Sequence, residues 1–342
     1  MLSFLLAIFG LSLLIVLHEG GHFVVARLCG MRVERFSIGF GPPLVAFKMG
    51  GTTFQIAPIF LGGFVQITGL NPNDEFVKTD PFVYPNRPRW MRLLTILAGP
   101  VANYVTAFVI MLFVLLAFGM PSKTQKIIEP LAGKPAAAAG LKANDVLVEA
   151  NGQKVSAENP ISEVIRAGQG APVTIKVLRQ GQPMTFQVTP EHVASGAFQV
   201  GIQIGPVDER THVAPLSALK EATVAPFYAS VGILATLSDM IRGRIHADLS
   251  GPIGITKQIK QAADLGIVPF LMLLFQLSVY LGLFNLLPVP ALDGARAAFL
   301  CVEGITRKRV NPRIEAAVHT AGFVLLMGVL IVVSVKDIIG KG

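Results

Sequence analysis

The chain has 342 residues, of which 52% are hydrophobic and only 15% are charged, and its net charge is +8. Soluble domains carry about 25% charged residues, so this composition excludes a cytosolic enzyme, a disordered regulator and a disulfide-rich secreted module. In so apolar a chain, the positive charge indicates basic loops beside a bilayer and not a nucleic-acid partner. The chain is predicted to be an integral membrane protein.

Four apolar runs are long enough to cross about 30 Å of hydrocarbon. They are residues 1–26, 93–118, 265–292 and 316–335. A cleaved signal peptide is the alternative for the first run. That run has no basic segment before its apolar stretch and continues past its charged residues, so we interpret it as a membrane helix.

A further run, residues 222–238, is uncharged but contains Pro226. A span there would reverse the sidedness of everything after it and place the basic loop 293–315 outside the cell. We therefore predict that residues 208–264 form an amphipathic segment lying on the membrane surface. The predicted fold is a polytopic α-helical membrane protein with four transmembrane helices.

Charge predicts the orientation of these helices. Residues 27–92 hold eight basic residues against four acidic ones, and residues 293–315 hold five against three. Short loops rich in Lys and Arg remain in the cytoplasm. Both termini and the long segment between 119 and 264 are therefore predicted to lie on the extracytoplasmic side.

Residues 120–207 differ in composition and are predicted to form an inserted α+β domain. Apolar and polar residues alternate over 173–177 and 184–188, which predicts two strands. Asn151-Gly152 supplies the positive φ that a tight turn between strands requires.

Residues 134–155 contain a run of small residues, then Gly140-Leu141 and Asp145, and this stretch resembles the core of bacterial PDZ domains. The resemblance implies peptide binding at an exposed sheet edge by β-augmentation. A spacer of PDZ shape that binds no ligand is the alternative.

The chemistry is predicted from the one acidic residue within the four runs, Glu19, which lies between His18 and His22. Ionisable residues are costly inside a bilayer and indicate function. On a helix the two imidazoles share one face and can reach one metal ion, and neutral imidazole suits Zn²⁺. Two buried histidines bonded to carbonyls are the structural alternative, which leaves the carboxylate unexplained.

Catalytic zinc takes a third protein ligand and keeps one position open. Asp293 follows the third run at the same predicted cytoplasmic depth as the two histidines, and Pro288 and Pro290 break the helix before it. Asp293 is the predicted third ligand. His319 in the fourth run is its competitor.

Together, His18-Glu19-Gly20-Gly21-His22, the PDZ-like domain and the segment from Asn285 to Asp293-Gly294 resemble the site-2 protease family of intramembrane zinc metalloproteases, in its bacterial RseP-type branch with a single PDZ domain. The resemblance implies that His18, His22 and Asp293 hold Zn²⁺ and that Glu19 is the general base. It implies that Asn285 contacts substrate. It also implies that a membrane-dipping sheet at 52–68 pairs with unwound substrate through Leu61, Gly62, Gly63 and Phe64.

The implied reaction is hydrolysis of a peptide bond within the transmembrane segment of a single-span protein. The family's substrates are anti-sigma factors or signal-peptide remnants that an upstream protease has already trimmed. The implied location is the bacterial cytoplasmic (inner) membrane, with the active site towards the cytoplasm. Residues 1–119 and 265–342 would form the membrane core.

Two other classes of function remain as alternatives. A non-catalytic, membrane-anchored PDZ adaptor with a structural metal site predicts four protein ligands and no cleavage. A metal transporter requires polar groups along several spans, whereas the second run offers only a few, such as Asn103.

Overall fold

The computed structural model describes residues 2–71, 79–121, 124–156, 159–192, 198–207, 210–244 and 251–339. The chain forms two compact units. The helical unit comprises Met1–Val114 and Pro215–Gly342, and the inserted unit comprises Leu115–Ala214. Each unit has its own buried apolar core.

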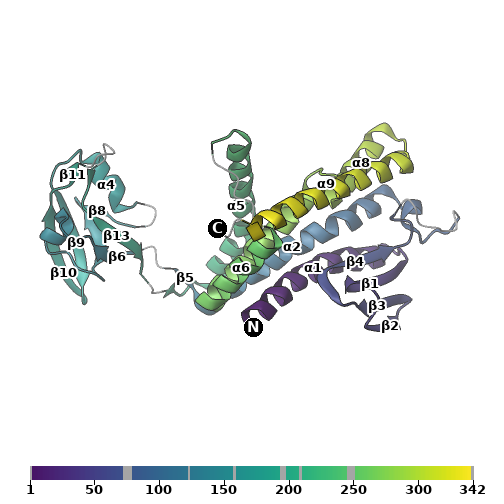
Figure 1. The fold of residues 1–342 in the computed structure, drawn as a ribbon, viewed down its shortest axis with the longest axis horizontal. Helices are drawn as coiled ribbons and strands as arrows, with labels where there is room; N and C mark the ends of the chain where they lie inside the picture. Colours follow the sequence, from purple (N-terminus) through teal and green to yellow (C-terminus); the bar gives the residue numbers. More distant parts are fainter. Residues whose placement is uncertain are drawn as a thin grey trace. The chain divides into compact units, whose positions relative to one another are not determined.

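Helices make up most of the helical unit (Figure 1). They are α1 (Leu2–Leu28), α2 (Arg89–Phe118), α5 (Pro215–Ile241), α6 (Pro252–Leu265), α7 (Ile267–Leu286), α8 (Asp293–Thr306) and α9 (Pro312–Ile339), with a 3₁₀ turn η1 (Tyr84–Asn86) before α2. Leu14 of α1 packs with Ile259 of α6 and Phe270 of α7. Ala26 and Leu300 belong to a second cluster that ties α1 to α8. Helix α1 is therefore packed against partners at two levels along its length.

Five of these helices are long and apolar enough to cross a membrane. They are the segment Phe9–Leu28 of α1, α2, α5, α7 and the segment Pro312–Asp337 of α9. The chain is thus a multi-pass membrane protein, but the predicted count of four spans is not confirmed, because α5 meets the same criterion. Pro226 lies inside α5 without ending it. Ser230 of α5 also lies 2.8 Å from the Tyr104 hydroxyl of α2, which ties α5 into the bundle.

A four-stranded sheet lies beside the carboxyl-terminal end of α1 (Figure 1). Its strands are β1 (Val33–Phe40), β2 (Val45–Met49), β3 (Thr52–Ile56) and β4 (Ile59–Ile67), in the order β2-β3-β1-β4. β1 runs parallel to β3 and antiparallel to β4. The strands expected within 52–68 are therefore confirmed as β3 and β4. β4 is an edge strand, so it has one unpaired side among the described strands.

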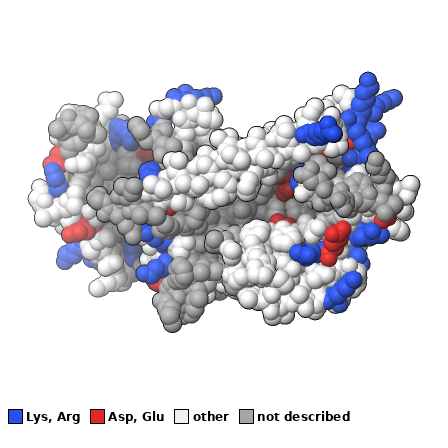
Figure 2. Space-filling model, turned by 45° about the vertical axis from the view of Figure 1, so that its right-hand side comes forward, with Lys and Arg blue, Asp and Glu red and all other residues white. Residues whose placement is uncertain are grey.

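Charged side chains are unevenly distributed over the helical unit. In Figure 2 the visible face of its helices is almost uniformly white, and Lys and Arg gather at the end that carries α8. Arg92 and Glu303 form a buried ion pair there at 2.6 Å. A broad apolar surface on long helices is the pattern of a multi-pass membrane protein.

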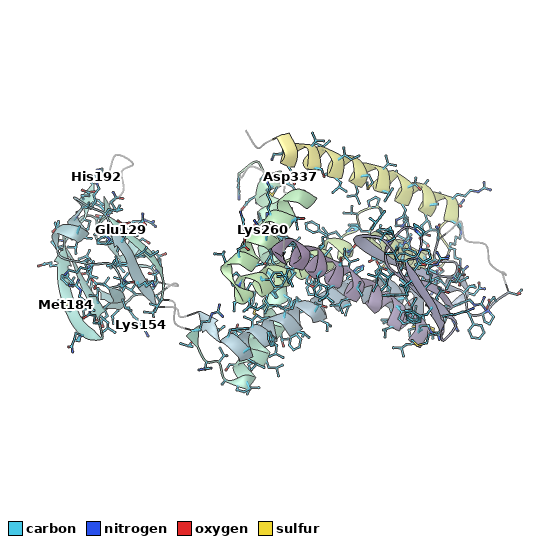
Figure 3. All side chains as sticks on the ribbon, turned by 60° about the horizontal axis from the view of Figure 1, so that its bottom comes forward. Glu129, Lys154, Met184, His192, Lys260 and Asp337 are labelled. Carbon is cyan, nitrogen blue, oxygen red and sulfur yellow. The ribbon has the colours of Figure 1, made fainter. Side chains whose placement is uncertain are left out.

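The inserted unit is built on a six-stranded sheet with the path β10-β9-β7-β6-β13 and β8 paired to β7. These strands are β6 (Gln125–Pro130), β7 (Val146–Ala150), β8 (Gln153–Lys154), β9 (Val173–Arg179), β10 (Gln182–Val188) and β13 (Ile202–Pro206). The short elements are α3 (Pro135–Ala138), α4 (Ile161–Ala167), β5 (Met120–Pro121), β11 (Glu191–His192), β12 (Phe198–Gln199) and β14 (Arg210–Thr211). Figure 3 labels Glu129 on β6 and Met184 on β10 of this sheet.

The strands predicted at 173–177 and 184–188 are confirmed as β9 and β10, which pair antiparallel. The predicted turn is confirmed too, since Asn151 and Gly152 have φ angles of 48° and 78° between β7 and β8. The identity of this unit as a PDZ domain stays a prediction.

A bidentate ion pair fastens the inserted unit internally. The guanidinium of Arg179 donates to both carboxylate oxygens of Asp145 at 2.7 Å, and the Lys142 amide donates to the same carboxylate at 2.8 Å. Burial opposes ionisation of Asp145, but these hydrogen bonds hold the pKa of its carboxyl below its usual value. The stabilisation is therefore complete above the unfolded-state pKa of about 3.9 and is lost as pH falls through the lower folded-state pKa.

Asp145→Asn is expected to lower the stability of the inserted unit by about 2 kcal/mol at neutral pH, because it replaces charged hydrogen bonds by neutral ones. Hydrogen exchange of β7 and β9 in the full-length protein, corrected for the intrinsic pH dependence of exchange, measures this. Glu149→Gln is the matched control. It removes a more exposed pair with Lys176 and should change stability by less than about 1 kcal/mol. An acid dependence that persists unchanged in Asp145→Asn would contradict the assignment.

Candidate metal centre

Helix α1 brings two histidines together because they lie one turn apart. His18 and His22 are 8% and 6% exposed, and their ring centroids are 4.9 Å apart. A helix is uninterrupted from Leu2 to Leu28, so both imidazoles project from one face. The same face is closed by α2, where Gly99 leaves room for both rings.

Asp293 reaches the histidines from the other half of the sequence. α7 ends at Leu286, and residues 287–292, which contain Pro288 and Pro290, are not helical before α8 begins at Asp293. The predicted break by proline is thus confirmed. His319 of α9 stabilises this loop, since its Nδ1 accepts a hydrogen bond from the Ala291 amide at 3.1 Å.

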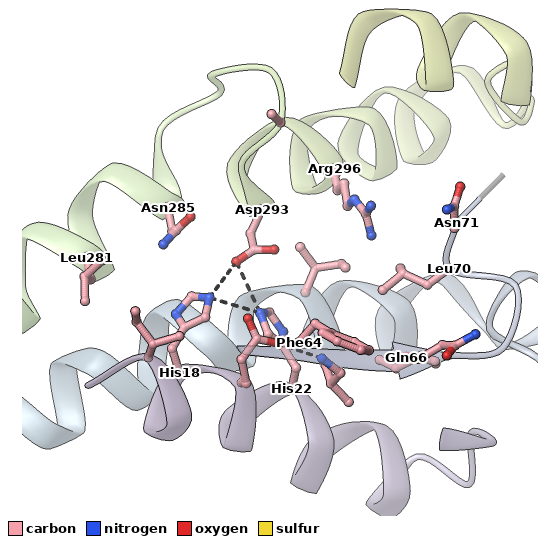
Figure 4. Close-up of a pocket in the computed structure, with 16 residues that line it drawn as sticks. His18, His22, Phe64, Gln66, Leu70, Asn71, Leu281, Asn285, Asp293 and Arg296 are labelled. Carbon is pink, nitrogen blue, oxygen red and sulfur yellow. Dashed lines mark hydrogen bonds and ion pairs between the residues drawn. The ribbon is translucent and has the colours of Figure 1, made fainter. Parts of the chain in front are cut away.

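Three potential ligand atoms meet at one point (Figure 4). The Oδ2 atom of Asp293 lies 3.2 Å from Nε2 of His18 and 3.2 Å from Nε2 of His22, and the two Nε2 atoms are 3.3 Å apart. Among the described residues, these three form the group of His, Cys, Asp and Glu side chains close enough to share an ion. His319, the competitor, is not in it.

The size of this triangle fits zinc. Ligand atoms about 2.0–2.1 Å from a tetrahedral zinc are about 3.3–3.4 Å from one another. The three observed separations of 3.2–3.3 Å match one face of such a tetrahedron. Two imidazole nitrogens and one carboxylate oxygen are also ligands that zinc accepts, and three protein ligands leave a fourth position for water or substrate.

The surroundings of His22 prepare it for a metal. Its Nδ1 lies 2.7 Å from the backbone oxygen of Thr95. A carbonyl oxygen only accepts, so Nδ1 carries the proton and donates it, and the lone pair of Nε2 is left for an ion. Sequence reasoning missed this partner because it is a backbone atom of α2.

Glu19 is held at the edge of the sheet. Its Oε2 accepts the Val65 amide of β4 at 3.0 Å. This amide belongs to the unpaired side of β4, because the other side of the strand pairs with β1. The carboxylate is therefore fixed between the two histidines of α1 and the strand beside them.

One cavity of about 520 Å³ is lined by the three potential ligands and by Glu19. Its other lining residues are Ile15, Phe64, Val65, Gln66, Ile67, Leu70, Asn71, Ile96, Leu281, Asn285, Ala291 and Arg296. The cavity thus includes Asn285 and Phe64, which the sequence singled out, and Gln66 and Ile67, which lie within the predicted sheet at 52–68 but were not named as substrate contacts. Arg296 was also missed. It follows Asp293 by three residues, the helical spacing that places both on one face.

Gly62 and Gly63, two other predicted β4 contacts, are not among the residues that line the cavity. Gly62 is buried against the Phe40 ring, and a side chain at Gly63 would meet the backbone oxygen of Ser37. Their small size is thus explained by packing within the sheet. The side chain of Leu61 lies outside the described residues.

Comparisons with known proteins agree with this arrangement. The family model described as Peptidase family M50 matches residues 6–329. A Clostridium perfringens protein assigned by its name to the zinc metalloproteases is 33% identical over 97% of both chains. Zinc metalloprotease RasP of Geobacillus kaustophilus is 30% identical over 95% of both chains, and Regulator of sigma-W protease RasP of Bacillus subtilis is 28% identical over 95% of both. With a family match over nearly its whole length, the chain belongs to peptidase family M50, the site-2 proteases.

Proposed function

We propose that this protein is an intramembrane zinc metalloprotease that cuts a peptide bond inside the membrane-spanning segment of a single-span protein. The observation that carries the proposal is the zinc-sized triangle of His18, His22 and Asp293 beside the Glu19 carboxylate, inside a cavity bordered by an edge strand. The site thus brings together three potential zinc ligands and a carboxylate that can act as general base, which a zinc-dependent hydrolase requires.

The proposed roles follow from the positions of the side chains. Bound zinc would polarise the substrate carbonyl and lower the pKa of a water molecule. Glu19, fixed by the Val65 amide, takes the proton from the attacking water and returns it to the leaving nitrogen. Asn285 at the end of α7 lies in the same cavity, and we propose that its amide donates to the substrate backbone or the developing oxyanion.

The edge strand β4 addresses a problem specific to this substrate. A peptide bond in a transmembrane helix is shielded by the helix's own hydrogen bonds, so the segment must unwind before water can attack it. The unpaired side of β4 offers backbone groups to an extended chain, and Phe64 to Ile67 already border the cavity. We propose that substrate pairs there by β-augmentation.

We also propose where the protein lies and which substrates it cuts. The active site faces the cytoplasmic side of a bacterial inner membrane, and the inserted unit, acting as a PDZ domain, lies outside with both termini. An anti-sigma factor already trimmed by another protease is the proposed substrate class. The name of the Bacillus subtilis relative, a regulator of sigma-W, supports this class.

The rival function is a membrane-anchored adaptor with a structural metal. Structural zinc sites have four protein ligands. In the part of the chain that the structure describes, three candidate ligands converge, and a cavity opens beside them. The arrangement therefore favours catalysis.

Reconstitution tests the proposed function directly. The purified protein in lipid vesicles is expected to cleave single-span peptides within their apolar stretch. Chelation of zinc should reduce the rate to background, and added zinc should restore it, because the ion supplies the polarisation of carbonyl and water. Mass spectrometry of the products locates the cut. Cleavage that continues after the metal has been removed would overturn the proposal.

A further inference from the structure

Asn103 of α2 is fully buried in the helical unit, with an exposed fraction of 0%. Its side-chain amide lies 3.0 Å from Nδ1 of His18, on the side of the ring opposite the metal-facing Nε2. We infer that Asn103 is a positioning residue that selects the zinc-binding tautomer of His18. The inference rests on the proposed zinc site.

The position of the proton on the His18 ring decides whether this residue can bind zinc. A neutral imidazole carries one proton, and a metal ligand must keep its lone pair on the coordinating nitrogen. If the Asn103 NH₂ group donated to Nδ1, that nitrogen would be an acceptor and the proton would be on Nε2. His18 would then present an N–H to Asp293 and His22 and could not bind zinc.

The opposite amide orientation removes this conflict. The two ends of an asparagine amide are nearly equal in shape, so the hydrogen-bond network decides which one faces the ring. With the amide nitrogen towards His18, the Oδ1 atom of Asn103 is buried and has no partner among the described residues. Exchanging the two ends of the amide breaks no hydrogen bond at the position that Oδ1 now occupies. It lets Oδ1 accept a hydrogen bond from the N–H of Nδ1.

The result would give both histidines the same kind of support. Nδ1 of His22 donates to the Thr95 carbonyl, and Nδ1 of His18 would donate to the Asn103 side chain. Both supports come from α2 and lie two turns of helix apart. In general, the second ring nitrogen of a metal-binding histidine donates a hydrogen bond from its N–H to an oxygen. This bond fixes the ring and raises its affinity for the ion.

The backbone of Asn103 is fastened separately. Its carbonyl oxygen accepts the hydroxyl of Ser278, on α7, at 2.8 Å. Ser278 is also fully buried. The chain therefore offers a control, because Ser278→Ala disturbs helix packing at the same residue without touching the amide that faces His18.

Zinc affinity of the full-length protein, measured by competition with a chromophoric chelator, tests the inference. Asn103→Leu keeps the size of the side chain but loses the acceptor, and should bind zinc about 10- to 100-fold more weakly. The zinc affinity of Asn103→Asp should stay within a few-fold of wild type, since a carboxylate can accept a hydrogen bond from the N–H of Nδ1. Ser278→Ala should leave the affinity unchanged.

The outcomes separate the inference from the proposed function. A wild-type protein that binds no zinc overturns both. A wild-type protein that binds zinc with an Asn103→Leu variant of equal affinity overturns only the role of Asn103. Weak binding by Asn103→Asp as well as Asn103→Leu also overturns it, because a hydrogen-bond acceptor at position 103 would then not be what supports zinc binding. Thermal unfolding of each metal-free variant shows whether it is folded.

Discussion

Glu19→Gln is expected to abolish peptide cleavage and to leave zinc bound. Glutamine keeps the shape of the side chain, and its oxygen can still accept the Val65 amide that now reaches Oε2 at 3.0 Å. It cannot take a proton from water, so the rate should fall at least about 10²- to 10⁴-fold. Single-turnover cleavage and the zinc content of the same preparation measure the two effects together.

Two further variants define what this result means. Asp293→Ala removes one of the three ligand atoms and should lose zinc as well as cleavage. Glu34→Gln makes the same chemical change at a carboxylate that accepts the Thr68 hydroxyl at 2.9 Å, within the same unit, and should keep both. A fully active Glu19→Gln enzyme would refute the role of Glu19 as general base.

The predicted site residues that the structure brings together share one property, which is that local spacing or depth determines their position. His18 and His22 are one helical turn apart, so any continuous helix brings them together. Asp293 was expected at their depth from charge and apolar length alone. The structure brings these three together, with nearly equal separations of 3.2–3.3 Å.

Contacts between distant segments were harder to foresee. The sequence contains Asn103 as a lone amide in an apolar run, which is a signal of function, but nothing in it says that the amide faces His18. His319 was weighed as a ligand, whereas its Nδ1 binds the loop at Ala291. Such pairings depend on how helices cross, and apolar periodicity does not specify that crossing.

Whether α5 spans the membrane was difficult to predict from the sequence for a different reason. The sequence reading gave weight to Pro226 and to the sidedness of the later loop. Pro226 is accommodated inside a continuous helix, and Ser230 one turn later donates its hydroxyl to the Pro226 carbonyl at 2.8 Å. Length and composition therefore admit a fifth span, and the sidedness of α7 and α9 depends on whether α5 crosses the bilayer.

The site is closely packed at Gly99, where α2 passes the two imidazoles. A methyl group at this position would overlap Nε2 of His22 and would lie 2.8 Å from Cε1 of His18. Both rings would have to move, although a metal site requires its ligands to be held within about 0.5 Å. Gly99→Ala is therefore expected to weaken zinc binding at least about 100-fold and to abolish cleavage, more severely than Asn103→Leu.

Two glycines in α1 provide the comparison for this variant. A methyl group at Gly20 would have no neighbour within 4 Å, so Gly20→Ala should keep zinc and cleavage close to wild type. A methyl group at Gly21 would overlap the Ala98 carbonyl, so Gly21→Ala should weaken the packing of α1 on α2 and lower the thermal stability of the metal-free protein. Gly99→Ala should instead retain most of that stability, because its methyl group meets side chains that can turn away. Normal zinc affinity in Gly99→Ala would show that the imidazoles do not lie against α2 as described.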